Sequence, residues 1–335
     1  MSGDRLDPMS ASAIRFSLIV ATVNRSHQLT RLLASLRAQT YQNFEVIIVD
    51  QNPPGFLTDV VAPFRVCFPL LHLRSDLGLS LARNVGLNRI SGQVVAFPDD
   101  DCWYPPETLQ RIADLLTTHP EWDGLSGRPA DPENPNSFSW YHRTSGSVDL
   151  RTVWRRSISI AIFLRREIVE TVGAFDENLG LGTPTGMLAA EESEYMIRVL
   201  QQGFHLHYRA DVILNHLALP YDEPRIARAL GEGRSFGYVL RKYRYPMVFA
   251  ITTWVRAFGG AMQAHLCGNR ERAQYYWALL RGRLQGWFVD SRRDAAIPIT
   301  FVAGKPRPHD HLAELVESAK SSQPERCSAA RVEGA

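Results

Sequence analysis

Three adjacent aspartates, Asp99, Asp100 and Asp101, follow directly after a short apolar run at residues 94–97. An apolar run of this length between turn signals is typical of a buried strand, so the carboxylates fall where the strand leaves its sheet. Neighbouring carboxylates repel one another unless a cation or hydrogen-bond donors compensate them. Mg²⁺ and Mn²⁺ prefer carboxylate and phosphate oxygens. The run therefore indicates a metal and phosphate site, although an acidic surface turn would show the same pattern.

A second acidic cluster, Glu191, Glu192 and Glu194, opens a predicted amphipathic helix. The helix dipole favours acids in a first turn, which is a sufficient structural explanation. Near a metal and phosphate site, a carboxylate can instead take a proton from an acceptor hydroxyl as a general base. The glycine-rich residues 173–186 precede this cluster and are predicted to form a mobile loop.

The elements that must position these acids alternate between strands and helices. Residues 16–23 and 44–52 are β-rich and mostly apolar, as buried parallel strands are, and leucines at helical spacing lie between them. Both strands end in polar residues, at the edge where open α/β sheets bind ligands. Asp50 ends the second strand, where it suits either a ribose or base contact or a turn before Pro53.

The segment between the second strand and the aspartates has the features of an anion site. Gly78 permits a tight turn, and Arg83 lies in the first turns of the helix that follows. Helix N-termini favour anions, and an arginine there adds a bidentate phosphate ligand. Further elements are predicted as strands at residues 66–73, 157–164, 204–208 (an edge strand) and 211–216, and as helices at residues 105–117 and 165–172.

The irregular segment between residues 125 and 153 is rich in turn residues and aromatic side chains. A long irregular segment in a compact domain is usually functional or disordered. Four ring-bearing side chains in this segment or just after it could line an acceptor pocket or simply pack in the core. They are Trp140, Tyr141, His142 and Trp154.

Four motifs, in the correct order, resemble the family 2 inverting glycosyltransferases. They are residues 21–25, Val49 with Asp50, residues 78–84, and residues 97–101. The resemblance spans residues 16–217. It implies an α/β protein of the GT-A type, the Rossmann-like fold of nucleotide-diphospho-sugar transferases, with a mixed sheet flanked by helices.

The resemblance also implies roles for the matching residues. Asp50 would accept a hydrogen bond from the nucleobase, with Thr22 lining the same pocket. Asn24 and Arg25 belong to the same nucleotide-sugar-binding motif. Arg83 would meet the diphosphate.

The metal ligands and the remaining donor contacts are implied in the same way. Asp101 would bind the metal, whereas Asp100 and Asp99 would contact the ribose or metal-bound water, and the order of these three roles stays open. His216 matches a family position at which a histidine joins the metal or diphosphate, and on that ground alone it is preferred over His205 and His207.

The acidic helix would supply the catalytic base. Matching the family pattern makes Glu192 the base, Glu191 its paired acid, and Glu194 and Arg198 supports. The family often has aspartate at the base position, so this chain departs from the pattern and the choice between Glu191 and Glu192 stays open. Inversion requires a single displacement with no covalent glycosyl-enzyme.

Composition limits the class of protein. The 335 residues, 45% apolar and 21% charged, suit one large or two ordinary globular domains. Four cysteines without metal or redox spacing indicate a reducing compartment. The first dozen residues resemble no signal peptide, and no apolar run reaches the roughly 18 residues of a membrane span. These observations predict a cytoplasmic protein.

The region from residue 221 to residue 300 is basic, with 13 Lys or Arg against 6 Asp or Glu, and rich in aromatic residues. Two or three amphipathic helices there could lie against anionic lipid at the inner face of the cell membrane, as a peripheral contact. Helices that merely close over the catalytic domain are an equally good interpretation. No nucleic-acid-binding motif accompanies the charge, so nucleic acid is not expected as a partner.

The predicted organisation is a disordered N-terminus (residues 1–14), a GT-A catalytic domain (15–220), a basic amphipathic helical extension (221–300) and a flexible tail (301–335). The predicted activity is metal-dependent, inverting transfer of a sugar from a nucleotide-diphospho-sugar to an acceptor hydroxyl, with Mn²⁺ or Mg²⁺. The default donor is a UDP-sugar, and the acceptor is a saccharide or a lipid-linked molecule in polysaccharide, cell-wall or glycolipid biosynthesis.

Two other classes of protein remain as alternatives. A nucleotidyltransferase would typically have a basic glycine-rich loop after its first strand, but residues 22–26 contain no glycine. A non-catalytic nucleotide-sugar-binding scaffold at the membrane surface is disfavoured by the intact acids at both clusters. The sequence leaves the donor sugar, the acceptor, the linkage and the oligomeric state open.

Overall fold

The computed structural model describes residues 13–289. The predictions for residues 1–12 and for the tail at 301–335 lie outside these residues. The strands are β1 (Phe16–Thr22), β2 (Phe44–Asp50), β3 (Leu70–Arg74), β4 (Val94–Ala96), β5 (Cys102–Trp103), β6 (Gly124–Ala130), β7 (Gly146–Ser147), β8 (Ile162–Arg165) and β9 (Leu206–His216). The helices are α1 (Ser26–Arg37), α2 (Thr58–Val61), α3 (Leu79–Leu87), α4 (Thr108–Thr118), α5 (Val153–Arg156), α6 (Arg166–Val172), α7 (Glu191–Gln201), α8 (Glu223–Lys242), α9 (Met247–Leu266) and α10 (Arg270–Phe288), with 3-10 helices η1 (Ala62–Phe64) and η2 (Ser159–Ala161).

Within residues 13–289 the strands form one mixed sheet in the order β3-β2-β1-β4-β8-β6-β9-β5, and β7 pairs with β9. Strands β1 to β4 are parallel, so their carboxyl ends share one edge. Strand β8 is antiparallel to β4, so the sheet changes direction beside the strand that leads to the three aspartates. The predicted α/β fold, a mixed sheet flanked by helices, is confirmed.

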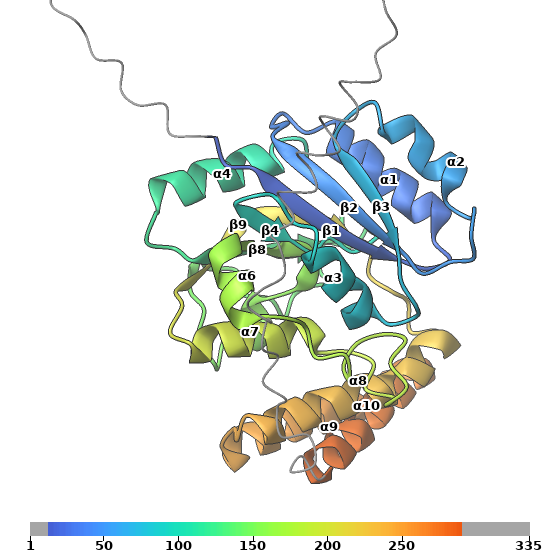
Figure 1. The fold of residues 1–335 in the computed structure, drawn as a ribbon. Helices are drawn as coiled ribbons and strands as arrows, with labels where there is room; N and C mark the ends of the chain where they lie inside the picture. The colour runs from blue at the N-terminus through green and yellow to red at the C-terminus, as the bar shows by residue number, and fades with distance from the viewer. Residues whose placement is uncertain (1–12, 290–335) are drawn as a thin grey trace, which may run out of the picture. The chain divides into compact units, whose positions relative to one another are not determined.

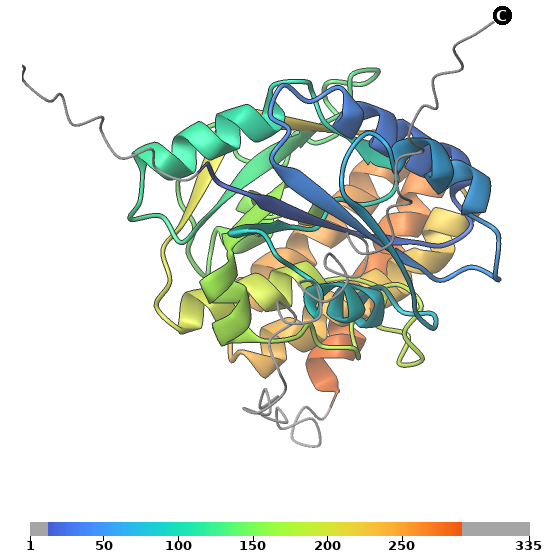
Figure 2. The ribbon, with the colours of Figure 1, turned by 45° about the horizontal axis from the view of Figure 1, so that its top comes forward.

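Two hydrophobic cores cover the two faces of the sheet, because alternate residues of each strand point to opposite sides. Leu18 and Val20 of β1 face the core that includes the buried side chains of α1 and α4. Ile19 and Ala21 face the core that includes buried residues of α3, α6 and α7. Figures 1 and 2 show α1 and α4 on one side of the sheet and α3 and α6 on the other.

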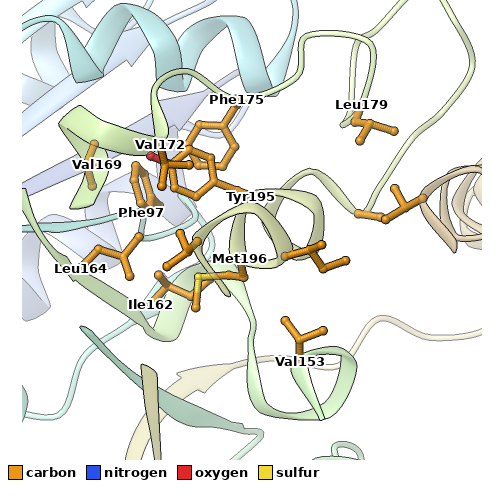
Figure 3. Packing of buried hydrophobic residues seen from close by; sticks show 14 of the residues in the cluster. Phe97, Val153, Ile162, Leu164, Val169, Val172, Phe175, Leu179, Tyr195 and Met196 are labelled. Atoms are coloured by element: carbon orange, nitrogen blue, oxygen red, sulfur yellow. The ribbon is translucent and has the colours of Figure 1, made fainter. Parts of the chain in front are cut away.

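The second core carries the helix with the acidic cluster. Figure 3 shows Phe97, Phe175 and Tyr195 in contact there. The Phe97 and Phe175 rings meet edge to face with centroids 5.1 Å apart, and Phe175 stacks on Tyr195 of α7 at 4.3 Å. These aromatic contacts tie α7 to the segment that ends in the three aspartates.

The prediction of two short strands at residues 204–208 and 211–216 is wrong. One continuous strand, β9, runs through both, and it lies inside the sheet between β6 and β5. The polar residues Arg209 and Asp211, in the middle of β9, pair with each other, and Arg111 of α4 also pairs with Asp211. The strand predicted at residues 157–164 begins later, because η2 occupies Ser159–Ala161 and β8 starts at Ile162.

Residues 223–288 form the three helices α8, α9 and α10. Helices α8 and α10 cross at very short range, because a methyl group added at Gly237 would stand 2.2 Å from the carbonyl oxygen of Arg283. Lys242, at the end of α8, joins these helices to α7 through Glu194, with an Nζ to Oε1 distance of 3.0 Å. None of the helices described between residues 13 and 289 combines the length and the apolarity needed to cross a membrane.

Candidate active site

The parallel register of β1 and β2 brings Thr22 directly beside Asp50 at the carboxyl edge of the sheet. Both side chains are buried. Asp50 accepts hydrogen bonds from the backbone and side-chain nitrogens of Asn52, at 2.8 and 2.7 Å, and its other oxygen lies 3.0 Å from Nε2 of His72. The bond to the Asn52 backbone is the turn-forming contact, and the bond to His72 faces the neighbouring strand. Asp50 therefore both shapes the turn and lies at the predicted nucleobase position.

The turn after β1 carries Arg25 toward the aspartates. Asn24 has a left-handed backbone (φ 56°), a conformation that asparagine tolerates better than most residues, and its amide donates to Oδ1 of Asn52 at 2.6 Å. The Nη1 atom of Arg25 then donates to Asp100 at 2.8 Å and to Asp101 at 2.5 Å. One guanidinium thus compensates two adjacent carboxylates.

The pairing of β5 with β9 brings the predicted metal ligands together. Cys102 and His216 are partners in that antiparallel register, which places His216 Nε2 3.1 Å from Oδ1 of Asp101. Burial opposes ionisation of Asp101, but the hydrogen bond and charge of His216, together with Arg25, lower the Asp101 pKa to about 2. Burial raises the pKa of Asp100 to about 6, against the effect of Arg25. Asp101 therefore stays ionised at pH values where Asp100 has begun to take up a proton.

The Asp101 and His216 pair fits a divalent cation that is completed by substrate. Among residues 13–289, no cluster of three or more His, Cys, Asp or Glu is arranged to hold a metal. An ionised carboxylate and an imidazole nonetheless form a suitable partial donor set, since Mg²⁺ typically takes one or two carboxylates and fills its remaining positions with phosphate oxygens and water.

Arg83 connects the two acidic clusters. Its side chain is 2% exposed, and its two terminal nitrogens donate to Oε1 of Glu191 at 3.0 Å and to Oδ1 of Asp99 at 2.9 Å. Its guanidinium also lies 5.4 Å from the ring centre of Phe175. Residues 99 and 191 are distant along the chain, so this arginine brings the two acidic clusters to one place. A direct contact between Arg83 and a diphosphate would require one of these ion pairs to open.

The two glutamates of the pair have different surroundings. Glu191 is buried against Arg83, whereas Glu192 is partly exposed and lines a small cavity with Arg83, Ser159 and Phe175. Burial, and next the charge of Glu191, raise the pKa of Glu192 above its ordinary range. Ala190, just before the pair, adopts a left-handed backbone (φ 67°), which is unusual for a residue other than glycine and typical of strained functional segments.

The loop before α7 is held by the start of α3. The amide of Phe175 donates to Oδ1 of Asn84 at 2.7 Å, and Nδ2 of Asn84 donates back to the Phe175 carbonyl at 3.0 Å. Ser80 Oγ donates to the Leu179 carbonyl at 2.7 Å. The motif at residues 78–84 therefore positions the loop that leads to the acidic pair, in addition to supplying Arg83.

The four aromatic candidates do not share one environment. Trp154 packs against Phe236 of α8 and is a packing residue. Tyr141 is buried, and burial followed by the charge of Glu192 raises its pKa. Trp140 is exposed beside it, with ring centres 5.6 Å apart. His142 offers its carbonyl to the hydroxyl of Tyr208 at 2.7 Å.

The structure adds residues that the sequence did not single out. Ser159 Oγ donates to Oδ2 of Asp99 at 2.9 Å, and Phe138 meets the His216 ring edge to face at 6.0 Å. His72 and Arg74 end β3 beside Asp50, with Nη1 of Arg74 3.7 Å from its carboxylate. His72 and Arg74 could have been predicted from the sequence, because they lie at the end of a parallel strand. Ser159 and Phe138 follow no local sequence pattern.

The mixed sheet and its flanking helices have the arrangement of the GT-A glycosyltransferases. Residues 17–174 match the model of "Glycosyl transferase family 2", so this segment is a family 2 domain, as the sequence resemblance implied. The chain is 23% identical over 248 residues to glycosyltransferase AglE of Haloferax volcanii, covering 71% of this chain and 79% of that protein. It is 29% identical over 171 residues to a PGL/p-HBAD biosynthesis glycosyltransferase of Mycobacterium bovis, covering 49% of this chain and 64% of the relative.

Solved structures share the fold at low sequence identity. S. aureus TarS 1-349 aligns with a TM-score of 0.52 and 19% identity, covering 88% of this chain and 98% of that one. The mannosyltransferase PcManGT from Pyrobaculum calidifontis, solved with GDP-Man and Mn²⁺, aligns with a TM-score of 0.54 and 19% identity, covering 94% and 83%. These likenesses establish the GT-A fold.

Proposed function

We propose that this glycosyltransferase moves a sugar, with inversion, from a nucleoside-diphosphate sugar to an acceptor hydroxyl. The observation that carries the proposal is the double ion pair of Arg83, which places Asp99 and Glu191 on one guanidinium. A single displacement needs an acid-rich phosphate site and a general base on opposite sides of one reacting carbon. The two acidic clusters supply both, at one edge of the sheet.

In this proposal the nucleoside contacts the end of β2 and the diphosphate lies near the end of β4. Asp50 and Thr22 face the nucleobase, and Asn24 and Arg25 form the turn above the diphosphate. TarS has been solved with UDP and with UDP-GlcNAc, and PcManGT with GDP-Man, which supports a nucleotide-sugar donor. A UDP-sugar is the first donor to test.

Asp101 and His216 would hold Mn²⁺ or Mg²⁺, with Asp99 and Asp100 toward the ribose or metal-bound water. When bound at these residues, such a cation would offset the negative charge that develops on the leaving diphosphate. Arg25, which compensates Asp100 and Asp101 in the structure, is placed to shift toward the phosphate when the acids gain another partner. Arg83 acts as a positioning residue that fixes the acids on both sides.

Glu192 is the proposed base, because it is the partly exposed member of the pair, whereas Glu191 is buried and engaged by Arg83. It would take the proton of the acceptor hydroxyl during attack on the anomeric carbon, and the nucleoside diphosphate would leave from the opposite face. Trp140 is exposed beside the buried Tyr141 and suits the stacking of an acceptor sugar. The acceptor class proposed is a saccharide or lipid-linked saccharide of polysaccharide, cell-wall or glycolipid biosynthesis.

The test is turnover of a panel of UDP- and GDP-sugars with Mn²⁺ or Mg²⁺. We expect slow, metal-dependent release of nucleoside diphosphate from at least one donor, with the inverted anomer of the sugar appearing first in the proton NMR spectrum. Asp101→Ala should abolish the metal-dependent release, whereas Asp114→Ala, which removes an exposed acid of α4, should not change it. Release of pyrophosphate from a sugar phosphate and a nucleoside triphosphate would instead identify a nucleotidyltransferase, and binding without release would identify a scaffold.

A further inference from the structure

Helix α9 carries its large apolar side chains on the outside. Small residues, including Ala250, Ala257 and Ala261, form the side that is buried against neighbouring elements. The exposed large residues recur every three or four positions and form one stripe along the helix. They are Met247, Ile251, Val255, Phe258, Met262 and Leu266, called here the α9 stripe.

The α9 stripe is too extensive for scattered surface residues. Val255 is 61% exposed and Leu266 is 82% exposed, and Val248 beside the first turn is 72% exposed. Single exposed apolar residues are ordinary, but a contiguous apolar surface of this kind marks a docking face. A helix with a small-residue inner side and a large apolar outer side has the pattern of one that lies in a membrane interface.

The charges around the stripe are of one sign. Residues 233–270 contain six Lys or Arg and no Asp or Glu. Three exposed arginines lie before, on and after α9, namely Arg244, Arg256 and Arg270, and across residues 13–289 none of them makes an ion pair. Unpaired cations beside an apolar face are complementary to an anionic lipid surface.

A cavity of about 560 Å³ adjoins the first turn of α9 and combines both features. It is lined by Val248 and Phe249 of α9 and by two arginines, Arg151 and Arg244. Arg244 has a left-handed backbone (φ 53°), a strained conformation for a bulky residue. The lining thus combines two cations with an apolar recess, an arrangement that suits a lipid headgroup phosphate with its acyl chain.

We propose that the α9 stripe and its flanking arginines dock this enzyme on an anionic lipid bilayer. The helix lies flat in the interface, with the stripe among the acyl chains and the arginines at the level of the phosphates. The docking does not depend on sugar transfer, so it can be tested without a donor.

The experiment is flotation of the full chain with vesicles of phosphatidylcholine alone and of equimolar phosphatidylcholine and phosphatidylglycerol. The wild type should float only with the anionic vesicles, and added salt should weaken binding because the charges are screened. Val255→Glu should reduce partitioning by about tenfold or more, because it removes an apolar group and adds a repelled charge. Val66→Glu is the matched control, since Val66 is 90% exposed before β3, and it should float like the wild type.

Two further measurements keep the outcome decisive. Thermal melts of the Val255→Glu and Val66→Glu proteins should coincide with the wild type, because both side chains are exposed. Arg244→Gln with Arg256→Gln should weaken flotation and reduce its salt dependence. The proposal is overturned if the wild type does not bind anionic vesicles, or if Val255→Glu floats as well as Val66→Glu. It is also overturned if light scattering shows a dimer that Val255→Glu dissociates, because a second copy of the chain would then cover the stripe.

Discussion

The buried guanidinium of Arg83 is bonded to Asp99 and to Glu191, and removing it leaves both carboxylates without their partner. Arg83→Met should therefore lower the free energy of unfolding by about 3 kcal/mol, because breaking a buried ion pair leaves an uncompensated charge. Arg111→Met is the matched control, since its pair with Asp211 is exposed and should contribute less than about 1 kcal/mol. Denaturant unfolding measures both, and equal effects would contradict the role given to Arg83.

The pH dependence of turnover tests the environment of Glu192. Burial and the charge of Glu191 raise its pKa, and a base acts only when deprotonated, so kcat/KM should rise with pH through a midpoint above the ordinary glutamate value of about 4.3. Glu191→Gln removes the neighbouring negative charge and frees Arg83 toward Glu192, so the midpoint should move to lower pH. A midpoint that stays in place or moves upward would show that another group titrates.

At the residue scale, the sequence predicted the groups that sit at strand ends or in short motifs. Asp50, Asp101 and Glu192 were singled out because they follow strands or match the motifs of the family, and their roles stay predictions. Ser159 and Phe138 were not found, because each reaches the site from an irregular segment and depends on tertiary packing. The buried double ion pair of Arg83 also lay beyond the sequence, which suggested an open phosphate contact.

Among the elements, the contact between α8 and α10 is the one that tolerates least change. A methyl group at Gly237 would stand 2.2 Å from the Arg283 carbonyl oxygen, whereas one at Gly259 of α9 would meet nothing within 4 Å. Gly237→Ala should destabilise the protein by about 1–3 kcal/mol or more through overpacking. Gly259→Ala should be neutral or stabilising by up to about 1 kcal/mol, since alanine favours a helix.

Guanidinium unfolding of the two alanine variants compares them directly. If Gly237→Ala proved as stable as Gly259→Ala, the close crossing of α8 and α10 would not exist in solution. The helices themselves were predictable from periodicity and aromatic content, but the glycine contacts were not, because a glycine in a helix gives no local sign of what approaches it. The sequence also predicted two short strands in place of β9. The polar middle of β9 is stabilised by Arg111 of α4, and the local sequence does not show a contact from another element.

At the scale of the whole molecule, the site exists because distant segments converge. The pairing of β5 with β9 brings His216 to Asp101, and Arg83 brings α7 to the aspartates. The order of strands and motifs predicted the GT-A fold and the shared edge, since parallel strands align their carboxyl ends. The sequence could not predict which glutamate faces the cavity, because that depends on the rotation of α7 against the aromatic contacts of its core.

The central claim is that Glu192 acts as the base at a site where other residues bind the nucleotide. The most direct measurement compares Glu192→Gln with Glu167→Gln, an exposed acid of α6, for UDP and GDP binding by calorimetry and for sugar turnover with Mn²⁺. We predict that Glu192→Gln binds nucleotide within about twofold of the wild type but loses turnover by about 10²-fold or more, while Glu167→Gln changes neither. Full turnover in the Glu192→Gln protein would contradict the account.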